Sequence, residues 1–493
     1  MENDVDVEKK KDKKPSLFKN IILNNFYQIL ILIVPLVTTP YVSRVLTPTG
    51  VGISSYTNSI VAFFTLFGAL GTVSYGTREI SRCRDDKKQL SKTFFEIEII
   101  TIFTALISLC AFLVLCLNYT EYKDYLWIWS FQIVAVIFDI SWLYAGLEKF
   151  KYNIIINALF KVTGCVMIFL FVKSQADVAK YIFINCMAML LGNMSMWLFL
   201  PKTVMFAKVE LKSIKNHFKE TLIYFIPTIA TSLYTVLDKT LLGVITKEND
   251  YNGQYESATK LVNLCKSIGF VAIADVISSR SSYLFKINDT VRINKLTKFT
   301  FDVVLTFSVA MSFGLVCIAD VFVPLFFGEG YDLTVTMIYM LAPVVTIIAI
   351  SYVGGGLYYI PAGKRKLSAG FLIAGSFVNL VFNIILINTV GPTGACISTI
   401  IAEGLISFLY MRFCKTYSFL DLANSIWKKI IAGIVMTITV YFISKIGISN
   451  LYVNLIVRIA VGAVVYFIVL FILRDNVFKY ALEKIKSRKA LEE

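Results

Sequence analysis

The sequence is poor in the groups that soluble enzymes use. Only 16% of its 493 residues are charged, against about 25% in an ordinary soluble domain. The single histidine, His217, lies in a basic stretch, where we expect a solvated loop. There is no GxxxxGK[ST] phosphate loop and no HExxH motif, and the only DxD, Asp4-Val5-Asp6, falls in the N-terminal tail. We therefore predict no catalytic residue, no metal ligand and no cofactor.

Disulfides and nucleic-acid binding are also poorly supported. The nine cysteines form no CxxC pair and lie almost entirely in apolar runs, which favours packing roles. The net charge of +15 comes from basic residues in short segments between hydrophobic runs. This distribution is typical of topology signals in a membrane protein rather than of a nucleic-acid surface.

Long hydrophobic runs dominate what is present. Apolar residues make up 57% of the chain, and windows of about 19 residues predict an all-α polytopic membrane protein of about fourteen transmembrane helices. The predicted spans cover residues 18–41, 53–73, 94–117, 125–146, 153–172, 180–200, 220–245, 254–277, 299–320, 333–359, 367–388, 393–413, 428–446 and 452–473.

The basic residues predict the orientation. Lys and Arg concentrate in the two tails and in alternate connections, such as Arg78–Lys92, Lys202–Lys219 and Arg280–Lys298. By the positive-inside rule these segments are cytoplasmic. An even number of spans then puts both termini in the cytoplasm. We expect the protein in the plasma (inner) membrane of the cell. The outer connections are short, so an external catalytic domain has no room.

A repeat of roughly 200 residues divides the chain. The segment from Gly52 to Ile60 opens the second span as the segment from Gly253 to Leu261 opens the eighth. Six spans separate them, which predicts two parallel-repeat six-helix lobes plus two extra helices. The predicted organisation is a cytoplasmic tail 1–17, an N-lobe 18–201, an interlobe linker 202–219, a C-lobe 220–413, a cytoplasmic loop 414–427, two further spans within 428–473 and a basic tail 474–493.

Polar stripes inside the spans predict a wet cavity. Ionised residues in lipid-facing positions are costly, yet Tyr224, Thr228, Ser232 and Lys239 follow one face of the seventh span. Similar faces carry charged, amide and aromatic residues on other spans: Gln132, Asp139, Trp142, Asn157, Lys161, Asn379 and Glu403, with Lys266 on the eighth. Asp238 lies beside Lys239, and the two could neutralise each other or border the cavity. The acids could pair with bases or take up protons.

Several stretches resemble a known family. They are Pro40-Tyr41-Val42-Ser43-Arg44-Val45-Leu46, Ser55-Tyr56-Thr57-Asn58-Ser59-Ile60, Tyr75-Gly76-Thr77-Arg78-Glu79-Ile80, Leu237-Asp238-Lys239 and Gly253-Gln254-Tyr255. On these the chain resembles the Wzx-type polysaccharide-unit flippases, exporters of O-antigen, capsule and teichoic-type units in the multidrug/oligosaccharidyl-lipid/polysaccharide (MOP) superfamily. One departure is Thr47-Pro48-Thr49-Gly50, where the family usually has a glycine directly after the leucine.

The resemblance implies a substrate: an oligosaccharide joined through diphosphate to a polyprenyl lipid, moved from the inner to the outer leaflet by alternating access. On this basis Lys161, Lys239 and Lys266 would hold the diphosphate. Asn157, Asn379, Gln132, Tyr224 and Trp142 would face the sugar, and Asp238, Asp139 and Glu403 would couple transport to H⁺ or Na⁺. Polysaccharide assembly enzymes would be partners. The alternatives are a cation-coupled multidrug antiporter and a membrane polymerase or glycosyltransferase.

Overall fold

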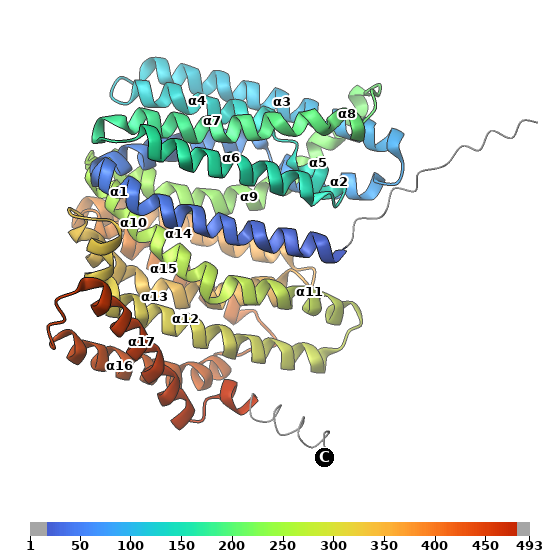
Figure 1. Cartoon of the computed structure of the whole chain (residues 1–493). Coiled ribbons are helices and arrows are strands. Elements are labelled where there is room, and N and C mark those ends of the chain that lie inside the picture. Colours follow the sequence, from blue (N-terminus) through green and yellow to red (C-terminus); the bar gives the residue numbers. More distant parts are fainter. Residues whose placement is uncertain (1–16, 481–493) are drawn as a thin grey trace, which may run out of the picture.

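The computed structural model describes residues 17–480, and these form helices joined by turns (Figure 1). The α-helices are α1 (Leu17–Ala69), α2 (Thr72–Cys83), α3 (Lys87–Asn118), α4 (Lys123–Ile137), α5 (Ser141–Gly146), α6 (Phe150–Phe171), α7 (Val178–Met196), α8 (Leu200–Thr203), α9 (Leu211–Thr246), α10 (Asn249–Lys266), α11 (Ala272–Lys286), α12 (Thr290–Phe326), α13 (Asp332–Gly354), α14 (Arg365–Val390), α15 (Thr393–Arg412), α16 (Phe419–Ser444) and α17 (Leu451–Ile472). Residues 1–16 of the predicted N-terminal tail and 481–493 of the predicted C-terminal tail lie outside this description.

The all-helical membrane fold is confirmed. Eleven helical segments in the described part of the chain are long and apolar enough to cross a membrane. The first two predicted spans lie together in α1, where only Thr47 leaves the helical conformation (φ 59°, ψ 173°), just before Pro48. The more polar α9, α10 and α11 are not among the eleven.

Several helices begin earlier than hydropathy predicts. α9 starts at Leu211, inside the predicted linker, and α3 and α12 start at Lys87 and Thr290. The Asp86 carboxylate accepts hydrogen bonds from the backbone N–H groups of Lys88 and Gln89 and so caps α3. A helix can continue into water because its backbone hydrogen bonds are internal, whereas a hydropathy window stops at the first charged residues.

The apolar cores follow the order of the chain. Two clusters, running from Val42 to Cys186 and from Tyr75 to Val204, are built by α1–α8 and their connections. The largest cluster runs from Leu242 to Tyr417 and belongs to α9–α15 and the segments joining them. α16 and α17 pack on α12 at the edge of the bundle (Figure 1). We call α1–α8 the N-terminal half and α9–α15 the C-terminal half.

The helices run between two ends that differ in charge. One end, called here the basic end, carries α2, α8 and the turn that joins α11 to α12 (Figure 1). The basic segments Arg78–Lys92, Lys202–Lys219 and Arg280–Lys298 fall there. The other end, called the opposite end, carries the bend at Thr47 and the turn that joins α9 to α10.

Candidate functional site

The two halves touch backbone to backbone near the opposite end, where α1 crosses α10. A Cβ atom added to Gly52 would lie 1.7 Å from the carbonyl oxygen of Asn249, and one added to Gly253 would lie 1.8 Å from that of Pro48. No side chain fits at either position. The absence of Cβ atoms is therefore what lets these helices approach so closely.

The contact is symmetric in sequence as well as in space. Pro48 and Asn249, Gly52 and Gly253, and Ser55 and Glu256 are each separated by 201 positions. The Ser55 hydroxyl donates to Glu256 Oε2 at 3.0 Å. Residues at equivalent places of the sequence repeat thus meet one another.

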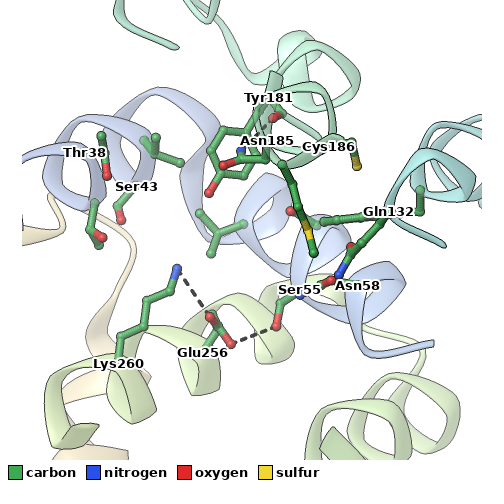
Figure 2. A pocket seen from close by; sticks show the side chains of 16 residues that line it. Thr38, Ser43, Ser55, Asn58, Gln132, Tyr181, Asn185, Cys186, Glu256 and Lys260 are labelled. Atoms are coloured by element: carbon green, nitrogen blue, oxygen red, sulfur yellow. Dashed lines mark hydrogen bonds and ion pairs between the residues drawn. The ribbon is translucent and has the colours of Figure 1, made fainter. Parts of the chain in front are cut away.

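A polar cavity of about 340 Å³ lies next to this crossing (Figure 2). Its walls come from α1, α4 and α7 of the N-terminal half and from α10 of the C-terminal half, with hydroxyl, amide and charged groups at Thr38, Thr39, Ser43, Ser54, Ser55, Asn58, Gln132, Tyr181, Asn185, Glu256 and Lys260. The Trp129 indole N–H, at the same wall, donates to Thr57 Oγ1 at 2.9 Å.

Glu256 organises the charge of this cavity. Its carboxylate forms an ion pair with Lys239 of α9 and a second one, at 3.3 Å, with Lys260. Figure 2 shows the Lys260 ammonium and the Ser55 hydroxyl both directed at this carboxylate. Two ammonium groups and one carboxylate leave one net positive charge. The cavity can therefore bind an anionic group of a ligand. Its neutral hydroxyl and amide side chains can form hydrogen bonds, as donors and as acceptors, with hydroxyl groups of the same ligand.

Asp238, the neighbour of Lys239, does not pair with that lysine. Its buried carboxylate accepts from the Tyr255 hydroxyl at 2.6 Å and from Asn383 Nδ2 at 2.7 Å, and Thr399 Oγ1 lies 2.9 Å away. The side-chain oxygen of Asn383 has no hydrogen-bond partner among the described residues. The Asp238 carboxylate is thus held by neutral groups inside the C-terminal half. The Asn383 side-chain oxygen beside it can still accept a hydrogen bond.

Two other predicted residues of the C-terminal half each lie one helical turn from a residue that contacts this carboxylate. Asn379 is buried on α14, one turn before Asn383. Glu403 is buried on α15, one turn after Thr399. Lys266 is half-buried at the end of α10 and makes no ion pair or hydrogen bond with the described residues.

The N-terminal half separates its predicted residues. Gln132 lines the cavity, and its side-chain oxygen has no partner among the residues described. Asp139 lines a second cavity of about 340 Å³ with Ser232 of α9, and its carboxylate accepts from the Ser141 N–H at 3.0 Å. Lys161 is exposed on α6, one turn after Asn157, and neither residue lines either of these cavities.

Two predicted aromatic residues pack away from the polar cavity. Trp142 is fully buried and stacks on Phe94, with ring centroids 5.4 Å apart, and its ring fills the space beside Gly76. The Tyr224 hydroxyl accepts a hydrogen bond from Arg78, which joins α9 to α2. Both side chains lie between packed helices. A polar stripe in the sequence does not show whether its residues face another helix or a cavity.

His217 is not in a solvated loop. It belongs to α9, its side chain is 16% exposed, and its Nε2 lies 3.3 Å from Glu96 Oε2. Its Nδ1 lies 2.6 Å from the Tyr75 hydroxyl, and Ser213 donates to the same carboxylate oxygen of Glu96 at 2.7 Å. This cluster joins α2 and α3 to α9 at the basic end, so the two halves also meet there.

Sequence reasoning missed most of the residues that line this cavity, and Glu256 is the most important of them. The Gly52 and Gly253 segments were recognisable as a repeat, and Glu256 and Lys260 are four residues apart on one helix face. What the sequence does not reveal is that Lys239, on the preceding helix, reaches the same carboxylate.

Comparisons with known proteins decide the family. Residues 17–278 match the family described as "Polysaccharide biosynthesis protein". The chain belongs to that family. A "Putative O-antigen transporter" of Escherichia coli (strain K12) is 25% identical over 407 residues, covering 82% of this chain and 97% of the relative. The family resemblance, and with it the expectation of a multi-pass membrane transporter, is confirmed.

Solved structures share the fold. "Lipid II flippase MurJ, inward closed conformation" superposes with a TM-score of 0.72 at 17% identity and covers 92% of this chain and 98% of its own. An "outward-facing conformation of a multidrug resistance MATE family transporter of the MOP superfamily" gives a TM-score of 0.52 at 11% identity, over 83% and 95% of the two chains. At these identities the likeness concerns the fold.

Proposed function

We propose that the protein is a flippase for cell-surface polysaccharide biosynthesis, which moves a polyprenyl-diphosphate-linked oligosaccharide from the inner to the outer leaflet by alternating access. The observation that carries this proposal is the cavity between the halves, which combines one net positive charge with hydroxyl and amide walls. A diphosphate-linked sugar needs both features, and its lipid tail can remain in the bilayer.

The membrane arrangement is part of the proposal. Fourteen spans form two parallel six-helix lobes and two further helices, with the basic end and both termini in the cytoplasm. The crossing of Gly52 and Gly253 then closes the outer side, and the contacts of His217 with Glu96 and Tyr75 hold the inner side together. Alternating access requires that these two contacts open in turn.

The charges suggest how the cargo binds. Lys239 and Lys260 share Glu256, so an incoming diphosphate can take over their ammonium groups in exchange for the carboxylate. Gln132 and its neighbours on α1 and α7 face the sugar. Lys161 and Lys266 are further cations for the diphosphate, with Asn157, Asn379, Tyr224 and Trp142 as further predicted sugar contacts. These six residues do not line this cavity in the present conformation.

Two sources of energy fit the residues. An inside-negative potential contributes about 2.3 kcal/mol per charge per 100 mV, so export of two negative charges would gain roughly 4.6 kcal/mol. Asp238, held by neutral donors in the C-terminal half, is the preferred site for coupling to H⁺ or Na⁺, with Asp139 and Glu403 as the next candidates.

A cation-coupled drug antiporter fits less well. A cationic drug would meet the net positive charge of Lys239, Lys260 and Glu256. The deciding experiment reconstitutes the purified protein in vesicles and measures leaflet transfer of a labelled diphosphate-linked glycolipid, with and without a potential or an ion gradient. Transfer of the glycolipid supports the flippase. Transport of a cationic dye without glycolipid transfer would overturn it.

A further inference from the structure

A pocket at the basic end shares no residue with the cavity between the halves. It has a volume of about 350 Å³ and lies between α11 and α12, close to the turn that joins them. Arg280 and Tyr283 of α11 face Arg292, Lys295 and Phe299 of α12 across it. With Tyr480, which also lines the pocket, three cations and three aromatic rings converge on one small volume.

The positive charge of this pocket is largely unneutralised. Neither Arg280 nor Lys295 forms an ion pair or a hydrogen bond with the described residues, and no acidic residue lines the pocket. Arg292 lies 3.2 Å from Asp289, but its side chain is 73% exposed, so the pairing is weak. At least two positive charges therefore remain available to a ligand.

Some other cations at the basic end have acidic partners. Lys298, one turn after Lys295 on α12, lies 2.8 Å from Asp421. Arg84 donates to Glu148 at 2.7 Å. The pocket differs from these pairs because its three cations line the same volume and no acidic residue lies among the lining residues. An anion bound among these cations would relieve their mutual repulsion.

The pocket also has apolar and aromatic walls. Tyr283 is 62% exposed, and the rings of Phe299 and Tyr480 meet edge to face with centroids 5.3 Å apart. Arg280 lies six residues before Lys286, the end of α11, which is about 9 Å along a helix. Aromatic rings beside cations near the end of a helix are typical of the boundary between lipid headgroups and acyl chains.

We propose that this pocket binds the headgroup of an anionic phospholipid from the leaflet at the basic end. Arg280, Arg292 and Lys295 supply donors for a phosphate, and two guanidinium groups can bind its oxygens bidentately. Tyr283, Leu284 and Leu296 then cover the start of the acyl chains. A soluble phosphate uses the cations but leaves this apolar wall uncovered, which is why a lipid is the better occupant.

The lipid fixes the position of α11. A π-helical turn, Ser267–Val271, separates α11 from α10 and interrupts the regular hydrogen bonding between them. A headgroup held by Arg280 on one side and by Arg292 and Lys295 on the other ties α11 to α12. This inference does not depend on the proposed function, because it concerns lipid binding alone.

The test compares two variants of the full-length protein that lose the same charge. The first is Arg280→Gln/Arg292→Gln/Lys295→Gln. The control, Lys87→Gln/Lys366→Gln/Lys415→Gln, removes three exposed basic residues outside the pocket. Native mass spectrometry of the purified proteins measures binding of phosphatidylglycerol and phosphatidylcholine, with inorganic phosphate as competitor. Melting temperatures in detergent show whether each variant is folded.

We expect the wild type and the control to bind one phosphatidylglycerol at least about tenfold more tightly than the pocket variant does. Phosphatidylcholine should show no such difference. Equal binding by the control and the pocket variant would overturn the proposal and leave these residues as topology signals. Displacement of the lipid by low millimolar inorganic phosphate would also overturn it, in favour of a soluble phosphate ligand.

Discussion

Gly52 and Gly253 occupy equivalent positions in the two halves of the chain and pack against each other's backbone. A Cβ atom on Gly52 would lie 2.9 Å from the Gly253 nitrogen, and one on Gly253 would lie 3.0 Å from the Gly52 nitrogen. The same two segments supply Ser55 and Glu256 to the cavity. Closure at the opposite end and the arrangement of the cavity charges are therefore coupled through a few residues of α1 and α10.

We expect Gly52→Val to open the opposite end. The new side chain collides with the Asn249 carbonyl, which belongs to backbone and cannot rotate away. Overpacking typically costs about 1–3 kcal/mol. Because the collision exists only where α1 and α10 are in contact, it destabilises the closed conformation relative to the open one. A cysteine at Ser54, which lines the cavity, should react faster with an impermeant maleimide added from outside.

Gly370→Val is the matched control, because a Cβ atom at Gly370 has open space around it. It should leave both labelling and export within about twofold of the wild type. Unchanged labelling in a folded Gly52→Val protein would show that this crossing does not control access.

Lys239 and Glu256 should have opposite effects on substrate binding. Glu256→Gln leaves two ammonium groups unneutralised, so we expect tighter binding of the diphosphate glycolipid and slower release. Lys239→Gln removes the net positive charge of the group, and we expect about tenfold weaker binding. Equilibrium binding and turnover in vesicles, measured separately, check both expectations. Weaker binding in both variants would mean that the ion pair is structural.

The proposed topology predicts that Lys87 and Asp332 lie on opposite sides of the membrane. Both are exposed, at the start of α3 and of α13. Single cysteines there should react with impermeant reagents from the cytoplasm at 87 and from outside at 332. Labelling of both from one side would require a different number of spans between them.

Hydropathy predicted the location of most helices because a membrane span must be long and apolar whatever surrounds it. It gave no information on how far α3, α9 and α12 extend into water, since their ends are fixed by backbone hydrogen bonds and caps such as Asp86. Polar stripes found Gln132, which lines the cavity, and Lys239, which forms an ion pair with Glu256 of its wall. They also selected Trp142 and Tyr224, which pack between helices, because helical periodicity identifies a buried face without saying what covers it.

The coupling role of Asp238 gives the last prediction. Asp238→Asn removes the only charge of the group formed with Tyr255, Asn383 and Thr399, while an amide of the same shape can still accept the Tyr255 hydroxyl. Because Lys239 pairs with Glu256 and not with Asp238, single-turnover binding of the glycolipid should stay within about twofold of the wild type. The return of the empty carrier should slow, and transport should lose its dependence on the H⁺ or Na⁺ gradient. Steady-state leaflet transfer, measured with and without each gradient, separates these effects from binding. If transfer by Asp238→Asn keeps its full gradient dependence, the coupling group lies elsewhere, and the same measurements on Asp139→Asn and Glu403→Gln identify it.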